Sequence, residues 1–393
     1  MALRFFDGLN WCSFAGSVYK YTFAAGFQGT GTQTLTGSID AGPFAGTKGI
    51  RYAVANCSVA NFFGNKGWEL DANLGAGAAS WIVSVWVKPQ GITSRQTFYA
   101  LRDQEVPNYN AKMAIHINAA NKLEIDFQQA PLRMNTLFGS QHLTSAYTFP
   151  DNAWTHICIA VNFLGGSSGN VTLWINGGMD SFLGGLNLLT SAQVQTVTLC
   201  WQNAGSAQIT MSTPIVFDTS GAVNNSRISP NARVTTIFPA SDVSNGLWMP
   251  SGAGGNFAQV NNPAFNAPAS SVTIATLAGD TDEQFGISPL GTTDSNLGLA
   301  LNTLLIGAGT QTVQGLMKQG ATKYLLGSPI TAPVAAGSYQ SIADVNPATG
   351  AAWKDSDISA DAWGFRALTG TGENVYQFYL EKLWQTTLGS YSY

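Results

Sequence analysis

Two acidic residues on one short strand have the types and spacing best suited to catalysis. The segment Leu123 to Gln128 alternates apolar and polar residues, which predicts a strand. Side chains two residues apart share a face of a strand, so we expect Glu124 and Asp126 to project together. Two carboxyl groups about 5 to 5.5 Å apart are what a retaining glycosidase uses to cleave its substrate.

The same segment resembles the E-[IL]-D-x-x-E strand of jelly-roll glycoside hydrolases. It departs from that pattern, because no further acid follows Asp126 in the segment up to Gln128 or directly after it. Alternation of this kind is also common in sheets with one solvated face. We therefore interpret the segment as a half-buried strand with a polar outer face, and keep a glycoside hydrolase using Glu124 and Asp126 as an alternative.

The histidines and cysteines form no local catalytic or metal-binding motif. His156 lies on an apolar strand, where a packed and hydrogen-bonded imidazole is expected. Without a CxxC pair, a zinc site has no support. Cys158 and Cys200 lie within apolar patterns, which favours buried free thiols. A disulfide between any two of the four cysteines, which also include Cys12 and Cys57, stays open.

Short apolar or alternating runs recur along the whole chain and predict an all-β fold. Clusters of Gly, Asn, Pro and Ser separate the runs, and the 43 glycines suit tight turns between many strands. Eight runs in the first part are the clearest: Ser80 to Lys88, Thr97 to Arg102, Met113 to Asn118, Lys122 to Gln128, Trp154 to Phe163, Asn170 to Asn176, Val194 to Gln202 and Gln208 to Asp218. Together they predict a sandwich.

Two of these runs form a recognisable pair. Trp154-Thr155-His156 opens a long apolar strand, and the strand from Asn170 ends in Ile175-Asn176-Gly177. An Asn-Gly turn closes a hairpin onto a further strand. The pair resembles the "W-x-H-hydrophobic" and "hydrophobic-N-G" hairpin of laminin G-like and pentraxin-like jelly rolls, which implies a concanavalin A-like jelly roll.

That resemblance implies two further expectations. Laminin G-like domains often hold calcium at a rim with aspartates and carbonyl oxygens. Asp180 and Asp218 lie beside turns and are the calcium candidates, with solvated turn aspartates as the alternative. No other cofactor is expected.

Scattered blocks over nearly the whole chain resemble a family of tailed-phage virion proteins, in which a jelly roll precedes a second β-domain. They are Phe5 to Gly8, Val216 to Asn225, Arg233 to Pro239 and Asp344 to Trp353, the last containing an "NPATGAAW" turn that leads into a short helix. The resemblance implies a virion protein made in the host bacterial cytoplasm. We expect a helix capped by Asp355 and Asp357 to follow.

Turn residues place a domain boundary in the middle of the chain. We expect a jelly roll over residues 1–238, a linker over 239–245 and a C-terminal β-domain for assembly or docking over 246–393. Gly252 to Ala269 is expected as a long loop docked on a neighbour. Trp384, Tyr391 and Tyr393 are candidate docking residues.

Charge excludes some partners. Only 10% of the residues are charged, and the net charge of −4 divides into 13 Lys and Arg against 11 Asp and Glu up to residue 237, then 5 against 11. Neither part is basic enough to neutralise a phosphate backbone, so no nucleic acid is expected. No run of about 20 apolar residues and no signal-peptide pattern occurs, so membrane insertion is not expected.

These patterns predict a virion structural protein on the tail or capsid surface that acts by contact and is not an enzyme. Its expected partners are other virion proteins and copies of itself, through broad polar interfaces. The first alternative is a carbohydrate-binding adhesin that holds host surface glycans, helped by multivalent display.

Overall fold

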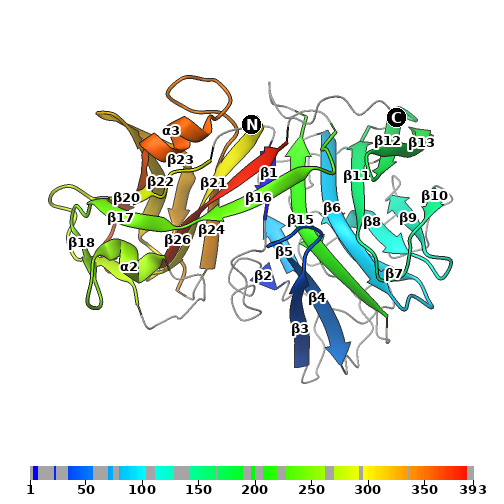
Figure 1. Ribbon diagram of the computed structural model, residues 1–393, viewed down its shortest axis with the longest axis horizontal. Coiled ribbons are helices and arrows are strands. Elements are labelled where there is room, and N and C mark those ends of the chain that lie inside the picture. Colours follow the sequence, from blue (N-terminus) through cyan, green and yellow to red (C-terminus); the bar gives the residue numbers. More distant parts are fainter. Residues whose placement is uncertain are drawn as a thin grey trace. The chain divides into compact units, whose positions relative to one another are not determined.

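The computed structural model describes residues 3–7, 22–23, 34–55, 70–73, 79–102, 111–127, 142–164, 166–188, 196–199, 207–219, 227–261, 270–291, 295–334 and 337–386. The described residues form strands and two short helices, as Figure 1 shows. They divide into two compact units, the first ending at Pro230 and the second beginning at Asn231. The prediction of an all-β chain with two β-domains is confirmed.

The first unit contains two antiparallel sheets. Sheet I has the order β13-β12-β11-β6-β15-β4-β3, with β1 paired to β15, and sheet II has the order β10-β9-β8-β7-β14-β5-β2. The strands of sheet I are β1 (Leu3–Phe6), β3 (Thr34–Ala41), β4 (Lys48–Ala55), β6 (Ser80–Gln90), β11 (Thr155–Asn162), β12 (Gly169–Ile175), β13 (Gly178–Leu186) and β15 (Gln208–Asp218). Those of sheet II are β2 (Thr22–Phe23), β5 (Leu70–Asn73), β7 (Gln96–Arg102), β8 (Ala111–Ile117), β9 (Lys122–Phe127), β10 (His142–Thr148) and β14 (Thr196–Leu199).

Side chains alternate between the two faces of each strand, and this alternation determines which of them form the core of the first unit. On β6 the side chains of Val83, Val85 and Val87 are buried, and on β9 those of Leu123 and Ile125 are buried, with their strand neighbours on the opposite faces. The buried valines of β6 lie on the inner face of sheet I, and the buried Leu123 and Ile125 of β9 lie on the inner face of sheet II. The predicted strands near these residues are confirmed.

The hairpin expected between residues 154 and 177 is present. β11 and β12 pair without interruption from Ile157 opposite Ile175 to Asn162 opposite Asn170. Asn176 and Gly177 have φ of 51° and 88°, a conformation that Asn and Gly tolerate best, and they turn the chain from β12 into β13. The turn therefore follows from its two residues.

The second unit is also built from two sheets. Sheet III has the order β18-β19-β26-β21-β24, with β16 paired to β26, and sheet IV has the order β17-β20-β25-β22-β23. Sheet III contains β16 (Ala232–Ile237), β18 (Trp248–Pro250), β19 (Val272–Ile274), β21 (Ser295–Ile306), β24 (Gly337–Ala343) and β26 (Asn374–Gln385). Sheet IV contains β17 (Pro239–Ser244), β20 (Asp282–Ile287), β22 (Thr312–Gln319), β23 (Thr322–Thr331) and β25 (Ala362–Thr369), and the helices are α2 (Asn256–Val260) and α3 (Asp355–Ala360).

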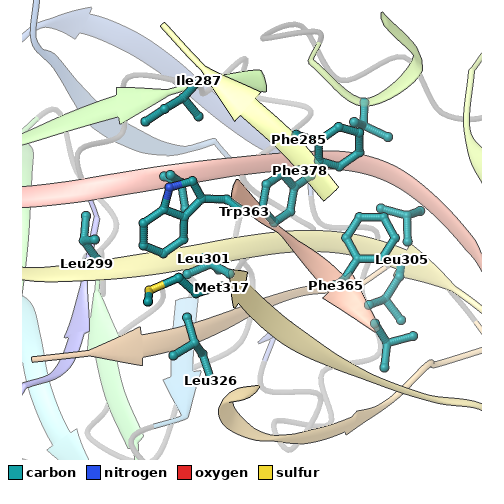
Figure 2. Packing of buried hydrophobic residues seen from close by; sticks show 14 of the residues in the cluster. Phe285, Ile287, Leu299, Leu301, Leu305, Met317, Leu326, Trp363, Phe365 and Phe378 are labelled. Atoms are coloured by element: carbon teal, nitrogen blue, oxygen red, sulfur yellow. The ribbon is translucent and has the colours of Figure 1, made fainter. Parts of the chain in front are cut away.

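Aromatic side chains join the two sheets of this unit. Phe378 of sheet III contacts Phe285 and Phe365 of sheet IV, with ring centroids 5.4 and 5.7 Å apart. Figure 2 shows these rings with Trp363 among aliphatic side chains of both sheets. Such tilted and edge-to-face ring pairs stabilise a core beyond their buried area by about 0.5 to 1.5 kcal/mol each.

The boundary between the units differs from the expected one. Residues 239–244, expected within a linker, form β17, which pairs with β20. The apolar and polar residues of β17 do not alternate strongly, and Pro239 at its first position argues against a strand, so the sequence pattern did not predict one there. Part of the expected loop from Gly252 forms α2, and residues 262–269 lie outside the described residues.

The helix predicted after residue 354 is present as α3, but its expected caps are absent. Asp355 instead accepts hydrogen bonds from Lys382 Nζ and Asn296 Nδ2, both at 2.9 Å, and the helix has no side-chain cap at its first residue. Lys382 is almost fully buried on β26. A buried ammonium needs a counter-charge more than a helix end needs a cap, so the carboxylate turns inward.

Glu283 is a second buried carboxyl group in this unit. Asn256 Nδ2 donates to its Oε2 at 2.8 Å, whereas Oε1 has no hydrogen-bond partner. Burial raises the pKa of Glu283 to about 8, and the nearby Asp242 adds to this effect. The side chain is therefore protonated at neutral pH.

This raised pKa predicts a loss of stability at alkaline pH. The folded pKa lies above the ordinary value, so the free energy of unfolding falls as pH rises through the window between about 4.5 and 8. Glu283→Gln removes the ionisation and should flatten this dependence in urea unfolding at pH 6 and pH 9. Thr322→Val, which changes an exposed side chain of the same unit that does not ionise, serves as the control and should keep the wild-type slope. An unchanged slope in the Glu283 variant contradicts the prediction.

Candidate functional site

Polar side chains gather on the outer face of sheet II. Thr97 of β7 lies opposite His116 of β8, and His116 lies opposite Glu124 of β9. Asp126 lies two residues further along β9, while Ile125 between them points into the core. The prediction that Glu124 and Asp126 share a face is consistent with this alternation and with their shared contacts. We call this group, with Arg95 and Asn118, the polar face.

His116 is at the centre of the polar face. Its Nδ1 lies 2.6 Å from the Thr97 hydroxyl, and its Nε2 lies 3.1 Å from Asp126 Oδ2. A carboxylate only accepts hydrogen bonds, so the proton belongs on Nε2 and the Thr97 hydroxyl donates to Nδ1. Burial lowers the pKa of His116, more than Asp126 raises it, so the imidazole is neutral at pH 7.

Arg95 joins the two carboxylates. Its Nε lies 2.9 Å from Glu124 Oε2, and its Nη2 contacts Asp126 Oδ2. Burial alone raises the pKa of Asp126, but the hydrogen bonds from His116 and Arg95, together with the charge of Arg95, outweigh this and hold that pKa below its usual range. Asn118 Nδ2 donates to the other oxygen of Glu124 at 2.8 Å. The carboxylate oxygens are thus held in fixed positions.

The polar face reaches solvent through some of its members. The side chains of Arg95 and Glu124 are 29% and 21% exposed, whereas His116 and Asp126 are at most 6% exposed. The outer face continues onto β10, where His142 lies opposite Asp126 and is exposed. A ligand on this face meets Arg95 and Glu124 first, with the histidine network beneath them.

This geometry bears on the glycoside hydrolase alternative. A retaining pair needs one protonated carboxyl group beside an ionised one. The lowered pKa of Asp126 keeps this carboxyl group ionised, and one guanidinium contacts both carboxylates. As arranged here, the pair offers fixed hydrogen-bond acceptors.

The two calcium candidates lie on different strands and already have partners. Asp180 of β13 accepts hydrogen bonds from the backbone N–H groups of Ala146 and Tyr147, at 2.9 and 2.8 Å. Asp218 at the end of β15 is fully buried and pairs with Arg4. No group of three or more His, Cys, Asp or Glu side chains suited to a metal occurs in the described part of the chain. The structure does not bring these two aspartates together.

The docking candidates are only partly described. Trp384 lies on β26, where its Nε1 donates to Thr235 Oγ1 at 2.8 Å and Lys382 Nζ lies 5.4 Å from its ring centroid. Its ring is thus engaged within the second unit. Tyr391 and Tyr393 lie outside the described residues.

His156 and Cys158 occupy the buried positions expected of them. Ser84 Oγ lies 2.8 Å from His156 Nε2, and burial lowers the pKa of this histidine to about 3. Cys158 is a free, buried thiol whose pKa burial raises to about 12. Both side chains are structural. Cys12, Cys57 and Cys200 lie outside the described residues.

The sequence did not reveal Arg95, Thr97, His116 and Asn118 as members of one site. They come from β7, β8 and the adjoining turns, and the register of β7, β8 and β9 brings them together with Glu124 and Asp126. A signal was present in composition, because charged residues are rare in this chain and Arg95, Glu124 and Asp126 lie within 32 positions.

Comparison with known proteins agrees with the architecture of the first unit. Residues 64–208 match a family model described as the concanavalin A-like lectin/glucanases superfamily. The first unit contains a concanavalin A-like domain. No curated protein matches the sequence. No helix in the described ranges has the length and apolar character that crossing a bilayer requires.

Solved structures similar to the chain include three different kinds of protein. An endo-β-1,4-glucuronan lyase from Trichoderma reesei is 13% identical, with coverage of 51% of this chain and 94% of that one and a TM-score of 0.39. Caenorhabditis elegans galectin LEC-6 is 12% identical over 39% and 92%, with a TM-score of 0.27. A carbohydrate esterase from the Shiga toxin-encoding bacteriophage phi24B is 17% identical over 48% and 88%, with a TM-score of 0.32.

One prediction from the sequence is corrected here. The expectation that the chain is not an enzyme is wrong as a deduction from its fold. The description of the matching family model names glucanases beside lectins, so that family includes enzymes. The concanavalin A-like architecture is shared by both kinds of protein, so it does not exclude catalysis.

The contacts of Arg95 predict the effect of its removal. Arg95→Ala leaves Asp126 and Glu124 without their shared cation and should lower the free energy of unfolding by about 1 to 3 kcal/mol at pH 7. The pKa of Asp126 is lowered in the folded state, so this stabilisation is lost as pH falls below about 4, and the difference from wild type should narrow there. Denaturant unfolding followed by tryptophan fluorescence measures both effects. Lys122→Ala on the same strand is the control; an equal loss in that variant contradicts the assignment.

Proposed function

We propose that the first unit binds carbohydrate through the polar face of sheet II. The observation that carries this proposal is the connected network of Arg95, His116, Glu124 and Asp126 on the solvent side of a sheet. A sheet that only covered a core would gain nothing from charges held there, because their desolvation is costly. The description of the matching family model, which includes lectins, supports the proposal.

The chemistry of the polar face suits a ligand rich in hydroxyl groups. The guanidinium, carboxylate and amide of Arg95, Glu124 and Asn118 are planar groups that can present two neighbouring hydrogen-bonding atoms to one ligand. Two neighbouring hydroxyl groups of a sugar can donate and accept hydrogen bonds with a spacing that matches two such atoms. The partial exposure of Arg95 and Glu124 leaves some of these positions open to solvent.

The network also holds the polar face in one arrangement before a ligand arrives. Asn118 fixes one oxygen of Glu124 and Arg95 fixes the other. His116 and Arg95 together hold Asp126. Ordering side chains on binding costs about 0.5 to 1.5 kcal/mol for each flexible one, and a fixed set avoids much of that cost.

A glycan array probed with the full chain tests this proposal. Glu124→Gln keeps the shape of the side chain but removes its charge, and should weaken binding about tenfold or more, since hydrogen bonds to charged groups are worth about 1.5 to 3 kcal/mol. Lys318→Gln in the second unit is the matched control and should leave binding unchanged. Absence of binding to every glycan, or equal binding by the Glu124 variant, overturns the proposal.

We further propose that the chain is carried in several copies on the surface of a tailed-phage particle, on its tail or its capsid, where its glycan partners are those of the host. The support is the resemblance of four blocks of the sequence to tailed-phage virion proteins, together with a charged fraction of 10%, which limits repulsion between packed copies.

The stoichiometry of the protein in purified particles tests this location. Hundreds of copies per particle are expected for decoration of a capsid or tail shaft, and a few to a dozen for a tail tip or fibre. Quantitative mass spectrometry of gradient-purified particles against a labelled standard measures the number. A protein that stays in the lysate and is absent from the particles contradicts the proposed location.

A further inference from the structure

The outer face of sheet I carries an exposed aromatic side chain close to its edge. β13 is the last strand of this sheet, and Phe182 on it is 61% exposed. Phe182 lies opposite Thr172 of β12, and in the next row Gly184 lies opposite Asn170. Asn170 in turn lies opposite Asn162 of β11. We call Asn162, Asn170, Thr172, Phe182 and Gly184 the edge platform.

The ring of Phe182 leans along its own strand over Gly184. A methyl group on Gly184 would lie 3.1 and 3.2 Å from Cε1 and Cζ of that ring. Because Gly184 has no side chain, the ring of Phe182 can occupy the space above it. One side of the ring rests near the backbone, and the exposure of the residue leaves the other side open to solvent.

An amide pair borders the ring. Asn162 Nδ2 donates to Asn170 Oδ1 at 2.8 Å. This bond fixes both amides, and the Asn162 oxygen and the Asn170 amino group take no part in it. Both residues are half-buried, so a ligand on the ring can reach one acceptor and one donor whose positions are already set.

The charge of the edge platform indicates the class of ligand. None of its five residues carries a charge, so it offers nothing to pair with a phosphate, sulfate or carboxylate group. A flat apolar ring bordered by polar groups suits a ligand with one apolar face and hydroxyls at its rim. A neutral pyranose has this form, since its C–H groups gather on one face of the ring.

A second copy of the chain is a poorer fit to the same place. Pairing of two β13 edges needs regular strands, and the β12–β13 pairing is interrupted between Leu173 and Trp174 and again between Gly169 and Asn170. Gly185 adds a positive φ of 73°. Irregular edges of this kind oppose strand addition.

We propose that the edge platform is a second carbohydrate-binding site, which stacks one neutral pyranose on Phe182 and holds its hydroxyls with Asn162 and Asn170. It lies on sheet I and shares no residue with the polar face of sheet II. It therefore stands or fails independently of the function proposed for that face.

Titration of the full chain with neutral β-1,4-linked hexasaccharides of glucose, mannose and xylose, followed by ligand-observed NMR, tests the site. At least one is expected to bind in the millimolar range. Phe182→Ala should weaken that binding about tenfold or more. Gly184→Val should weaken it similarly, because the new side chain displaces the ring while the phenylalanine remains. Met179→Ala, which shortens a 70% exposed side chain of the same strand, is the matched control and should have little effect.

The outcomes separate the two sites. Binding that Phe182→Ala weakens and Glu124→Gln does not supports the edge platform. Binding that Glu124→Gln weakens and both platform variants leave intact overturns the edge platform while supporting the polar face. Absence of binding by all three sugars at millimolar concentration overturns the edge platform. The edge platform is also overturned if Phe182→Ala and Gly184→Val alter only self-association, measured by sedimentation. That result would assign the surface to a contact between copies of the chain.

Discussion

The antiparallel register between β6 and β11 is the constraint on which the surfaces of the first unit depend. These strands pair over eight successive residues, from Thr155 opposite Val87 to Asn162 opposite Ser80. A shift of one residue would turn every side chain of a strand to the other face. β12 and β13 continue the sheet from β11, and their own registers place Asn162, Asn170 and Gly184 in one row. Chemistry at the edge of the sheet is thus set by apolar packing at its middle.

Strand alternation made part of this structure predictable. The strands around Val85, Ile125 and Ile159 follow from their residues, and the same period places Glu124 and Asp126 on one face. The partners of these carboxylates did not follow, because Arg95 and His116 reach them only through pairing between strands. Phe182 was not predicted for a different reason. Gly184 and Gly185, which follow it, suggest a turn, yet they belong to β13. Sequence patterns predict on which face of a sheet a side chain lies, but they do not predict which strand pairs with its own.

The second unit shows how a chain poor in charge places several of the charges that it has. Arg366 makes a bidentate pair with Asp282, and Lys323 contacts the same carboxylate, which is 1% exposed. Lys382 and Asp355 are buried together elsewhere in this unit. Hydrogen bonds and paired charges restrict such a core to one arrangement, because any alternative leaves a charge without its partner. Low overall charge and buried ion pairs therefore coexist, and composition alone gives no sign of these pairs.

The pairing of β1 with β15 has a consequence for how the protein is made. Arg4 and the buried Asp218 form an ion pair across 214 positions of sequence, and Phe6 lies opposite Ile215. While the chain emerges from the ribosome, the first strand has no partner until nearly the whole unit has been synthesised. Contacts so distant in sequence make folding slow. A strand edge left unpaired for that time favours misassociation between growing chains.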